Sequence, residues 1–233
     1  TLADLKKILP GVDPAFRGKA YPTCAVVGRS GSLLLRRYGP SIDAQSVVFR
    51  FDDAPTEGYA PNVGVKTSVR WTAGDYWGFH ERAEEVILVP TRSKDAIVGL
   101  VWNIQQPSPL NLLATDPDFE NWVAGSFAFD PGAELKGALL ALHVCRHVTL
   151  FGVGLGREQG VGARYDDACG AGELSAARAA MAAERGGLEP GLDEVTAALA
   201  RRWETLSALH EAGMLSFGEP CVVECRGQRD EGE

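Results

Sequence analysis

Several features that mark specialised protein classes are missing from this sequence of 233 residues. It has no run of Lys or Arg, and 31 acidic against 23 basic residues give a formal net charge of −8. Because nucleic acid is a polyanion, this balance disfavours it as a partner. No apolar stretch reaches the roughly 18 to 20 residues that span a bilayer, and the sequence shows no internal repeat.

Cysteine occurs five times, at Cys24, Cys145, Cys169, Cys221 and Cys225, and never as a Cys-x-x-Cys pair. That spacing is typical of structural zinc sites, so its absence disfavours zinc. Cys24 opens a predicted strand and Cys145 closes a predicted helix, both beside apolar segments. Each alone is typical of a buried structural thiol, and together they can form a bridge in an oxidising compartment.

The remaining composition is that of an ordinary globular domain, with 45% hydrophobic and 23% charged residues. The length predicts a single domain over residues 1–227 with a large core. Residues 228–233 are polar and acidic, which predicts a disordered tail. The chain begins at Thr1 rather than at Met, and we expect it to be a domain excised from a longer protein.

Short apolar runs alternate with helical patterns along the chain, which predicts an α/β fold with a mainly parallel sheet. Apolar runs that stop at Gly or Pro are typical of strands buried on both faces. Strands are predicted over residues 25–27, 47–51, 67–72, 85–90, 97–102, 147–153 and 221–225. Helices are predicted over residues 2–9, 33–35, 111–114, 119–124, 136–144, 174–184 and 193–212.

One stretch has the outline of a nucleotide-binding βαβ unit. The apolar run 25–27 enters the turn Gly-Arg-Ser-Gly at residues 28–31, and a second apolar run ends at Asp52. In such a unit the turn lets the backbone approach a phosphate, and an acidic residue accepts from a ribose hydroxyl. A second glycine cluster, residues 152–156, follows another predicted strand. Ligands of parallel sheets bind beyond such strand ends.

Two other interpretations of this outline stay open. The same order of strand, turn, helix and strand occurs in βαβ units that are purely structural. Together with the glycines in residues 152–156, it also fits a dinucleotide-dependent oxidoreductase. The first turn, however, lacks the full Gly-x-Gly-x-x-Gly pattern of those enzymes.

The spacing over residues 24–67 resembles the large sialylmotif of the eukaryotic sialyltransferases, glycosyltransferase family 29. That motif reads Cys-x-x-Val-Gly-Asn-Ser-Gly, Gly-x-x-Ile-Asp, Asn-x-Ala-Pro-Thr-x-Gly-(Tyr/Phe) and Val-Gly-x-Lys-Thr. The matching positions are Cys24, Val27, Gly28, Ser30, Gly31, Gly39, Ile42, Asp43, Ala54, Pro55, Thr56, Gly58, Tyr59, Val63, Gly64, Lys66 and Thr67. The spacing is kept throughout, so the resemblance is specific.

A second segment, residues 131–154, is similar to the small sialylmotif of the same family. It matches at Pro131, Ala141, Leu142, His143, Cys145, Val148, Leu150, Gly152 and Gly154. Tyr165 and Asp166 resemble the end of the third motif. By these segments the chain is identified as a divergent member of the family over roughly residues 20–217.

The resemblance implies a GT-A-like variant with a Rossmann-type, mainly parallel sheet flanked by helices. It implies CMP-activated sialic acid, or a related keto-sugar acid, as the donor, a glycan hydroxyl as the acceptor, and transfer with inversion. It implies no metal and no other cofactor. It also implies a disulfide between Cys24 and Cys145, a place in the Golgi lumen, and a membrane anchor outside this chain.

The departures from the family pattern gather at the positions that carry the chemistry. The large motif's two nucleotide-holding asparagines are Arg29 and Asp52 here, and the small motif's donor-binding Ser/Thr-Gly is replaced by Gly-Ala-Glu at residues 132–134. The third motif's His falls at Ala163 and its first Tyr at Arg164. Since transfer needs a base and stabilisation of the leaving phosphate, these departures put activity in question.

The family's general base is the His of a His-x-x-x-x-Glu motif, and no histidine stands there in this chain. One alignment register puts the His at Ala197 and the Glu at Arg202. Another register puts them at Leu199 and Glu204. The catalytic residue is therefore unknown from the sequence.

The four histidines of the chain lie elsewhere. His80 lies in an aromatic loop and could face a sugar, and His147 starts a strand where it could be exposed. His143 is predicted to be a buried core histidine. His210 is predicted to be structural, at a helix end where the dipole favours its positive form.

The residues predicted to bind the nucleotide donor are Gly28, Arg29, Ser30, Gly31, Asp52 and Tyr165. Arg29 is either a phosphate clamp or a solvated arginine, and Asp52 either accepts from ribose hydroxyls or is a solvated strand end. The phenol of Tyr165 is expected to contact a phosphate oxygen. Adjacent acids at residues 52–53 and 166–167 point apart, so we expect no metal there.

Two functions follow from these observations. The first is a sialyltransferase-like glycosyltransferase that uses a CMP-activated donor. The second is a catalytically inactive member of the family with a binding or scaffolding role in the Golgi lumen.

Overall fold

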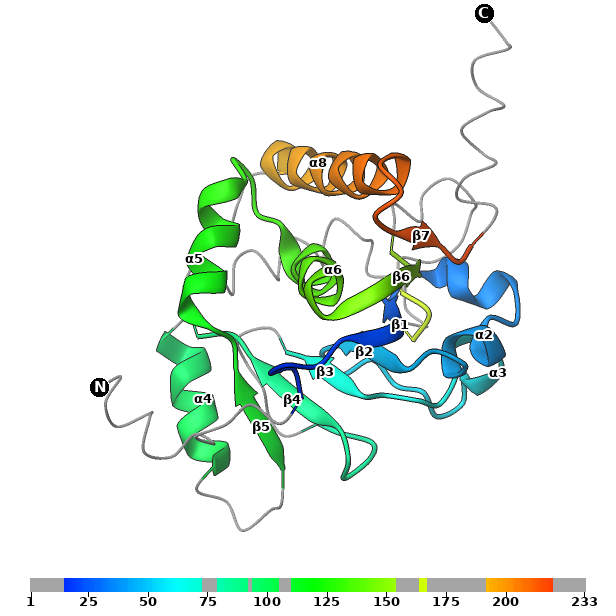
Figure 1. The fold of residues 1–233 in the computed structure, drawn as a ribbon, viewed down its shortest axis with the longest axis horizontal. Helices are drawn as coiled ribbons and strands as arrows, with labels where there is room; N and C mark the ends of the chain where they lie inside the picture. The colour runs from blue at the N-terminus through cyan, green and yellow to red at the C-terminus, as the bar shows by residue number, and fades with distance from the viewer. Residues whose placement is uncertain are drawn as a thin grey trace, which may run out of the picture.

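The computed structural model describes residues 15–72, 79–91, 94–104, 110–153, 164–166 and 192–219. Within them, seven strands form one parallel sheet in the order β5-β4-β3-β2-β1-β6-β7 (Figure 1). The strands are β1 (Tyr21–Val27), β2 (Val47–Phe51), β3 (Val69–Trp71), β4 (Val86–Val89), β5 (Asn111–Ala114), β6 (Cys145–Phe151) and β7 (Ser216–Phe217). The chain builds the sheet outward from β1 to β5 and then returns to the other side of β1 with β6.

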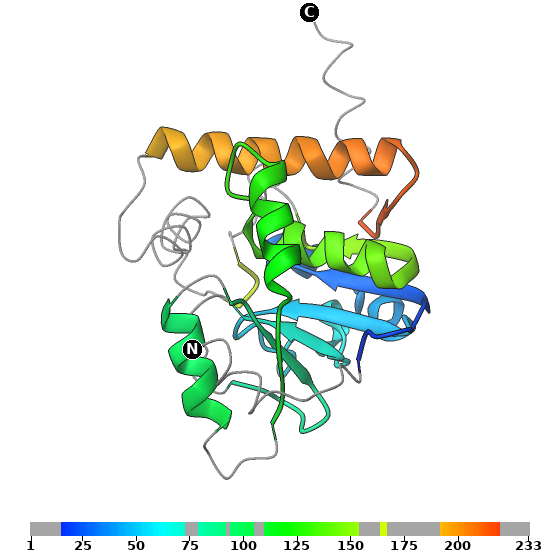
Figure 2. The same ribbon diagram turned by 60° about the vertical axis from the view of Figure 1, so that its left-hand side comes forward.

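Helices cover both faces of this sheet. They are η1 (Gly31–Leu35), α2 (Gly39–Asp43), α3 (Ala60–Val63), α4 (Lys94–Ile104), α5 (Pro117–Ser126), α6 (Gly132–Val144) and α8 (Leu192–Glu211). α6 packs on β1, β2 and β6, and α8 lies on the outer side of α6 (Figures 1 and 2). η1, α2 and α3 pack together and cover the opposite face. None of the described helices is both long and apolar enough to cross a membrane.

The alternation of side chains along the strands produces two cores, one on each face. On β2, Phe49 and Phe51 join the core beneath α6, whereas Val48 joins the core with Ile42 of α2. All five residues of β2 are buried, as expected for a central parallel strand. Gly137 of α6 makes room for the ring of Phe51, because a Cβ there would lie 2.6 Å from it.

Part of the segment that resembles the large sialylmotif holds the backbone of α2 against the backbone that follows α3. The carboxylate of Asp43 accepts from the amides of Val65 and Lys66, each at 2.9 Å. Gly64 has a φ of +74°, and a Cβ on it would lie 2.4 Å from Asp43 Oδ1. A Cβ on Gly39 would lie 2.2 Å from the carbonyl oxygen of residue 60. These residues form what we call the α2–α3 bracket, Gly39, Asp43 and Gly64.

The predicted fold class and the predicted disulfide are confirmed. The Cys24–Cys145 bridge joins the middle of β1 to the start of β6, with 6.1 Å between the Cα atoms and 121 residues between the cysteines in sequence. In the sheet, Cys24 stands beside Val148 and Cys145 beside Tyr21. The bridge thus links two neighbouring strands of the central sheet.

Three predictions from the sequence are wrong. Residues 97–102, predicted as a strand, lie in α4, where Leu100 is buried while Val98 and Trp102 are exposed. Residues 111–114, predicted as a helix, form β5. Short apolar runs of this length do not distinguish strand from helix by periodicity. His143, predicted to lie in the core, is exposed on α6.

Other predictions lie outside the described residues. They concern the helices over residues 2–9 and 174–184, the strand over 221–225, the tail over 228–233, the aromatic loop over 73–78, the glycines at 154 and 156, Ala163, and the three cysteines beyond the bridge, Cys169, Cys221 and Cys225.

Candidate functional site

The carboxyl ends of β1 and β6 meet where the strand order reverses, the place where open parallel sheets bind ligands. The Gly28 amide donates to the Phe151 carbonyl (2.8 Å), and the Ser30 amide donates to the Gly152 carbonyl (3.1 Å). A Cβ on Gly28 would lie 2.3 Å from the Gly152 oxygen, so this approach requires glycine. We call residues 28–31 the β1 turn and residues 152–153 the β6 turn; the two are held directly against each other.

Arg29 extends from the β1 turn into a cluster of four charged side chains. Its guanidinium pairs with Asp53 and with Asp166, and Arg164 lies 3.0 Å from Asp166 and 3.5 Å from Asp53. We call Arg29, Asp53, Arg164 and Asp166 the arginine–aspartate cluster. Burial alone would lower the pKa of Arg29, but Asp166 and Asp53 outweigh it and raise that pKa above its ordinary value.

Tyr165 connects the β1 turn to the loop that follows β2. Its hydroxyl donates to the carbonyl of Pro55 (2.7 Å), and its amide donates to the carbonyl of Arg29 (3.0 Å). The ring packs edge-on against Tyr59 and is 3% exposed, and burial raises the pKa of Tyr165 to about 12. These contacts support a positioning role; the predicted contact with a phosphate oxygen stays a prediction.

Asp52 directly follows β2 and has a φ of +48°, a left-handed conformation that Asp and Asn tolerate better than most residues. Its amide donates to the carbonyl of Trp71 (2.8 Å), and its own carbonyl accepts from Arg70 (2.9 Å). The backbone therefore turns sharply at the carboxyl edge, next to the arginine–aspartate cluster. Asp52, which stands where the family pattern has Asn, adds a negative charge at this turn.

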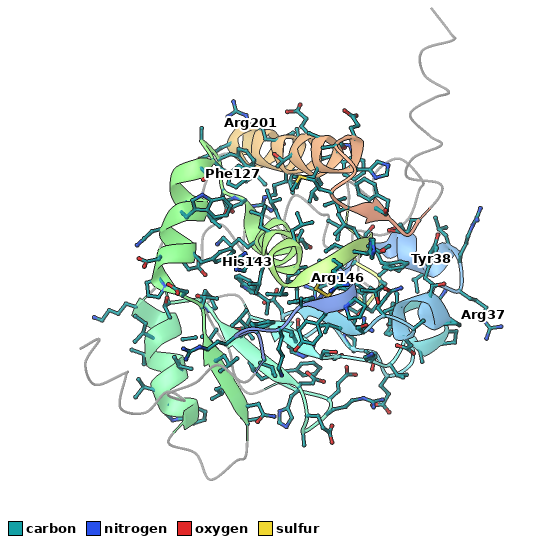
Figure 3. The ribbon with its side chains drawn as sticks, in the orientation of Figure 1. Arg37, Tyr38, Phe127, His143, Arg146 and Arg201 are labelled. Atoms are coloured by element: carbon teal, nitrogen blue, oxygen red, sulfur yellow. A yellow bond between two sulfur atoms is a disulfide. The ribbon has the colours of Figure 1, made fainter. Side chains whose placement is uncertain are left out.

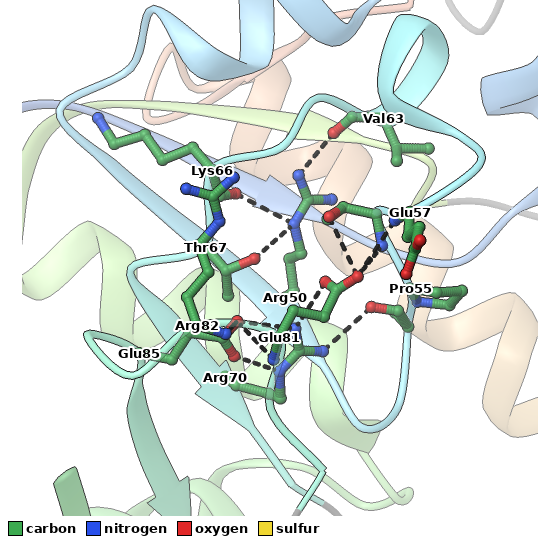
Figure 4. A network of polar contacts seen from close by, with 12 residues as sticks. Arg50, Pro55, Glu57, Val63, Lys66, Thr67, Arg70, Glu81, Arg82 and Glu85 are labelled. Carbon is green, nitrogen blue, oxygen red and sulfur yellow. Dashed lines mark hydrogen bonds and ion pairs between the residues drawn. The ribbon is translucent and has the colours of Figure 1, made fainter. Parts of the chain in front are cut away.

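A buried ion pair holds the loop after β2 in place (Figure 4). Arg70 lies 2.6 Å from Glu85 and 3.3 Å from Glu81, and neither the Arg70 nor the Glu85 side chain is exposed. Glu81 accepts from the amides of Thr56 (2.7 Å) and Glu57 (3.1 Å). Burial alone would raise the pKa of Glu81, but these amides and Arg70 lower it. Arg70 thus fixes the loop that carries Asp52 and Pro55.

A second buried arginine, Arg50, stands beside Arg70 in the sheet register. It donates to Thr67 Oγ1 (3.1 Å), to the carbonyl of Lys66 (3.1 Å) and to that of Val63 (2.6 Å) (Figure 4). Its partners are neutral oxygens, and burial lowers the pKa of Arg50 to about 10. Arg50 ties β2 to the segment after α3.

The start of α6 brings further charges to the same edge. Arg202 of α8 donates to the carbonyl of Asp130 (2.8 Å) and pairs with its carboxylate (2.5 Å). Gly132 has a φ of +65°, and a Cβ there would lie 2.6 Å from the Arg202 guanidinium. Burial raises the pKa of Glu134, and Asp52 adds to this effect, while Arg202 and Arg29 oppose it. Glu134 therefore shares the electrostatic surroundings of Asp52 and Arg29.

Comparison with known proteins agrees with these features. A family model described as glycosyltransferase family 29 (sialyltransferase) matches residues 1–96. The porcine CMP-N-acetylneuraminate-beta-galactosamide-alpha-2,3-sialyltransferase 1 is 32% identical over 178 residues, which cover 66% of this chain and 51% of the relative. The human protein of the same name is 30% identical, with 66% and 52% covered. The chain is a divergent member of the sialyltransferase family.

The fold of this chain matches that of a mammalian sialyltransferase crystal structure. The TM-score is 0.67 at 22% identity, over 94% of this chain and 77% of the other. A plant protein named Sialyltransferase-like protein 2, from Oryza sativa subsp. indica, is 29% identical over 182 residues, which cover 59% of this chain and 46% of the relative. The chain spans about half the length of the curated relatives it matches.

The helix that should carry the family's base is α8, and it carries none at the expected positions. Ala197 and Arg201 line a cavity of about 430 Å³, together with Phe127, Asp130 and Glu194. Figure 3 shows Arg201 on α8 and Phe127 beyond the end of α5 at this part of the molecule. His210 lies toward the other end of α8, where its Nδ1 is 3.1 Å from the carbonyl oxygen of Leu215.

The described charges at the carboxyl edge of this family member sum to an excess of acid. Three arginines face five carboxylates: Arg29, Arg164 and Arg202 against Asp52, Asp53, Asp130, Glu134 and Asp166. This excess repels anionic groups that approach the edge. Among the residues that the structure describes, no group of three or more His, Cys, Asp or Glu side chains is placed to hold a metal ion.

The predicted site residues lie together at one edge of the sheet. Gly28, Arg29, Ser30 and Gly31 form the β1 turn, Asp52 follows β2, and Tyr165 bridges the two. The sequence did not reveal that Arg29 is paired with Asp53 and Asp166, or that Arg202 is paired with Asp130. The signal available in the sequence was charge at the ends of apolar segments, which marks the edge but leaves the pairing open.

Proposed function

We propose that the chain is a glycosyltransferase domain that binds a CMP-activated sialic acid, or a related keto-sugar acid, beyond the ends of β1, β2 and β6. It transfers the sugar to a glycan hydroxyl with inversion. The observation that carries this proposal is the position of Arg29, a partly buried cation on a glycine turn at the reversal of the strand order. A cation there stabilises the charge on a leaving CMP phosphate.

The pairing of Arg29 determines how a phosphate would reach it. The Asp53 side chain is 65% exposed, whereas that of Asp166 is 11% exposed. Asp53 can therefore turn into solvent at little cost, while Asp166 keeps the guanidinium oriented. In the proposed complex the phosphate replaces Asp53, and Asp52 accepts from the ribose hydroxyls.

Replacing Arg29 with alanine is expected to weaken CMP binding by about 10 to 100 fold, because a charge-assisted hydrogen bond contributes about 1.5–3 kcal/mol. Isothermal calorimetry with CMP measures this. The matched control is Arg37→Ala, which removes the same charge from an exposed position outside the cluster. Equal affinity in the two variants would show that Arg29 does not contact the phosphate. Asp53→Asn should strengthen binding, because it frees the guanidinium.

We assign the role of general base to Glu134. Its pKa is raised, which moves a carboxyl toward the working range that a base requires. It stands on the first turn of α6, and α8 offers no histidine at Ala197 or Leu199. Glu134 takes the proton of the acceptor hydroxyl as the sugar leaves CMP.

Glu134→Gln should lower transfer by about 10² to 10⁴ fold, the usual contribution of a general base, and leave CMP affinity unchanged or higher. The assay uses CMP-sialic acid with Gal-beta-1-3GalNAc-ortho-nitrophenol, the compound bound in a crystal structure of a mammalian sialyltransferase. Glu84→Gln is the control, because Glu84 is exposed at the opposite edge of the sheet. Full activity in Glu134→Gln would remove this residue from the chemistry.

The second candidate is a catalytically inactive member that binds or scaffolds other proteins in the Golgi lumen. Two observations favour it: the missing histidine on α8 and the excess of acid at the carboxyl edge. CMP binding without turnover on any acceptor would support it. A lumenal place accords with the Cys24–Cys145 bridge, since disulfides persist in oxidising compartments.

A further inference from the structure

Glu219 is a buried carboxylate that the arginine–aspartate cluster does not use. Glu219 follows β7 and is only 2% exposed. The carboxylate accepts from Ser32 Oγ (2.7 Å) and from the amide of Gly152. Among the described residues, no Lys or Arg pairs with it. Burying a carboxylate without a cation costs free energy, and hydrogen bonds to the carboxylate must offset that cost.

The chain after β7 brings the Glu219 carboxylate next to the carboxyl end of β6. β7 runs parallel to β6, and the amide of Gly218 continues the ladder by donating to the carbonyl of Leu150 (2.8 Å). A Cβ on Gly218 would lie 2.1 Å from the ring of Phe151. Because residue 218 is glycine, the backbone passes close to Phe151, and Glu219 reaches across to η1.

The two partners of Glu219 belong to the two sides of the candidate donor site. Ser32 lies in η1, directly after the β1 turn, and Gly152 begins the β6 turn. One backbone bond already joins the two turns, a second joins the β1 turn to the end of β6, and Glu219 links η1 to the β6 turn. Gly152 has a φ of +62°, and a Cβ on it would lie 2.5 Å from Leu33, so the turns have little room to shift.

We propose that Glu219 is a positioning residue for the donor site, which sets the relative placement of the β1 turn and the β6 turn through Ser32 and Gly152. This rests on the proposed function, because the turns are the surface that receives the CMP phosphate. Arg29 on the β1 turn then stands at a fixed distance from the β6 turn. The ligand whose affinity depends on this placement is a nucleotide monophosphate or its sugar ester.

The charge of Glu219 also acts on the ligand. Burial raises its pKa, an effect that the bonds from Ser32 and Gly152 oppose. Of the elements packed around it, the β1 turn contributes Arg29 with its partners Asp53 and Asp166. η1, the described end of β6 and β7 contribute no charged side chain. Ionisation of Glu219 therefore adds a negative charge behind the turns, and CMP affinity falls as the pH rises through that pKa.

The test compares Glu219→Gln with Glu219→Leu by CMP titration between pH 5 and 7.5 and by amide hydrogen exchange. Glutamine keeps both links, since its oxygen can accept from Gly152 and its nitrogen can donate to Ser32. It should bind CMP within about twofold of wild type at the lowest pH of the series and lose the part of the pH dependence that Glu219 supplies. Leucine leaves two buried donors unpaired and should bind about tenfold more weakly or worse. The Gly152 and Ser30 amides should then exchange faster.

Each outcome has a clear meaning. Equal CMP affinity in the leucine variant and wild type, or equal loss in both variants, overturns the proposal. An unchanged pH profile in Glu219→Gln overturns the charge effect. If wild type itself does not bind CMP at millimolar concentration, the proposed function fails, and the exchange rates of Gly152 and Ser30 alone decide whether Glu219 holds the turns. Amide exchange across the strands of the sheet in Glu219→Leu shows whether any loss in that variant comes from unfolding.

Discussion

Replacing both Cys24 and Cys145 with alanine is expected to lower the free energy of unfolding by about 4 to 5 kcal/mol. The bridge closes a loop of 121 residues, and in the chain-entropy model its removal frees the unfolded chain. Both cysteines are buried, at 0% and 8% exposure, so the double variant also loses buried contact area. Urea denaturation of the double variant against wild type measures the change.

Reduction of the wild-type protein provides an independent control, because it opens the bridge without changing any side chain. The reduced protein should unfold at a urea concentration close to that of the double variant. A difference of less than about 1 kcal/mol between wild type and the double variant would contradict the chain-entropy model for this bridge. In that case the remaining stability comes from the two cores.

Arg70→Met should lower the free energy of unfolding by about 3 to 5 kcal/mol, because it leaves the carboxylates of Glu85 and Glu81 without their cation. Glu85 is fully buried and lies 2.6 Å from Arg70. Thermal and urea unfolding measure the loss. Combining Arg70→Met with Glu85→Gln should recover part of it, since the buried charge is then removed with its partner.

Arg50→Met is the matched comparison for Arg70→Met. Arg50 is equally buried and stands beside Arg70, but its partners are two carbonyls and a hydroxyl. Its replacement removes a cation without leaving an unpaired carboxylate, so the loss should be smaller. An equal or larger loss in Arg50→Met would contradict the view that the carboxylates determine the cost at position 70.

The fold could be predicted from the sequence wherever pattern and spacing agreed. The strands over residues 25–27 and 47–51 carry β-rich apolar runs that end at Gly28 and Asp52, and the motif resemblance implied the bridge at Cys24. At residues 97–102 and 111–114 the runs were short and the periodicity was ambiguous. At these two runs, the structure depends on which side chains neighbouring elements bury. In α4 the described side chains are buried on one face, whereas in β5 both Leu112 and Leu113 are buried.

The candidate site could be predicted less completely, for a physical reason. The position of Arg29 follows from local spacing, but its pairing with Asp166 joins residues 137 positions apart. The same holds for Glu219 and Ser32, which are 187 positions apart. Such contacts are set by the way the strands and their connections fold back on the sheet. No local pattern contains them.

The α2–α3 bracket has a consequence for how this family changes over evolutionary time. Gly39, Asp43 and Gly64 hold backbone to backbone, so selection for a folded protein retains them even in a lineage that no longer transfers sugars. Arg29, Asp52 and Glu134 lie instead at the carboxyl edge, where the proposed ligand binds. We therefore expect the bracket to be retained in members of the family whether or not they transfer sugars, and the three edge positions to vary with the ligand.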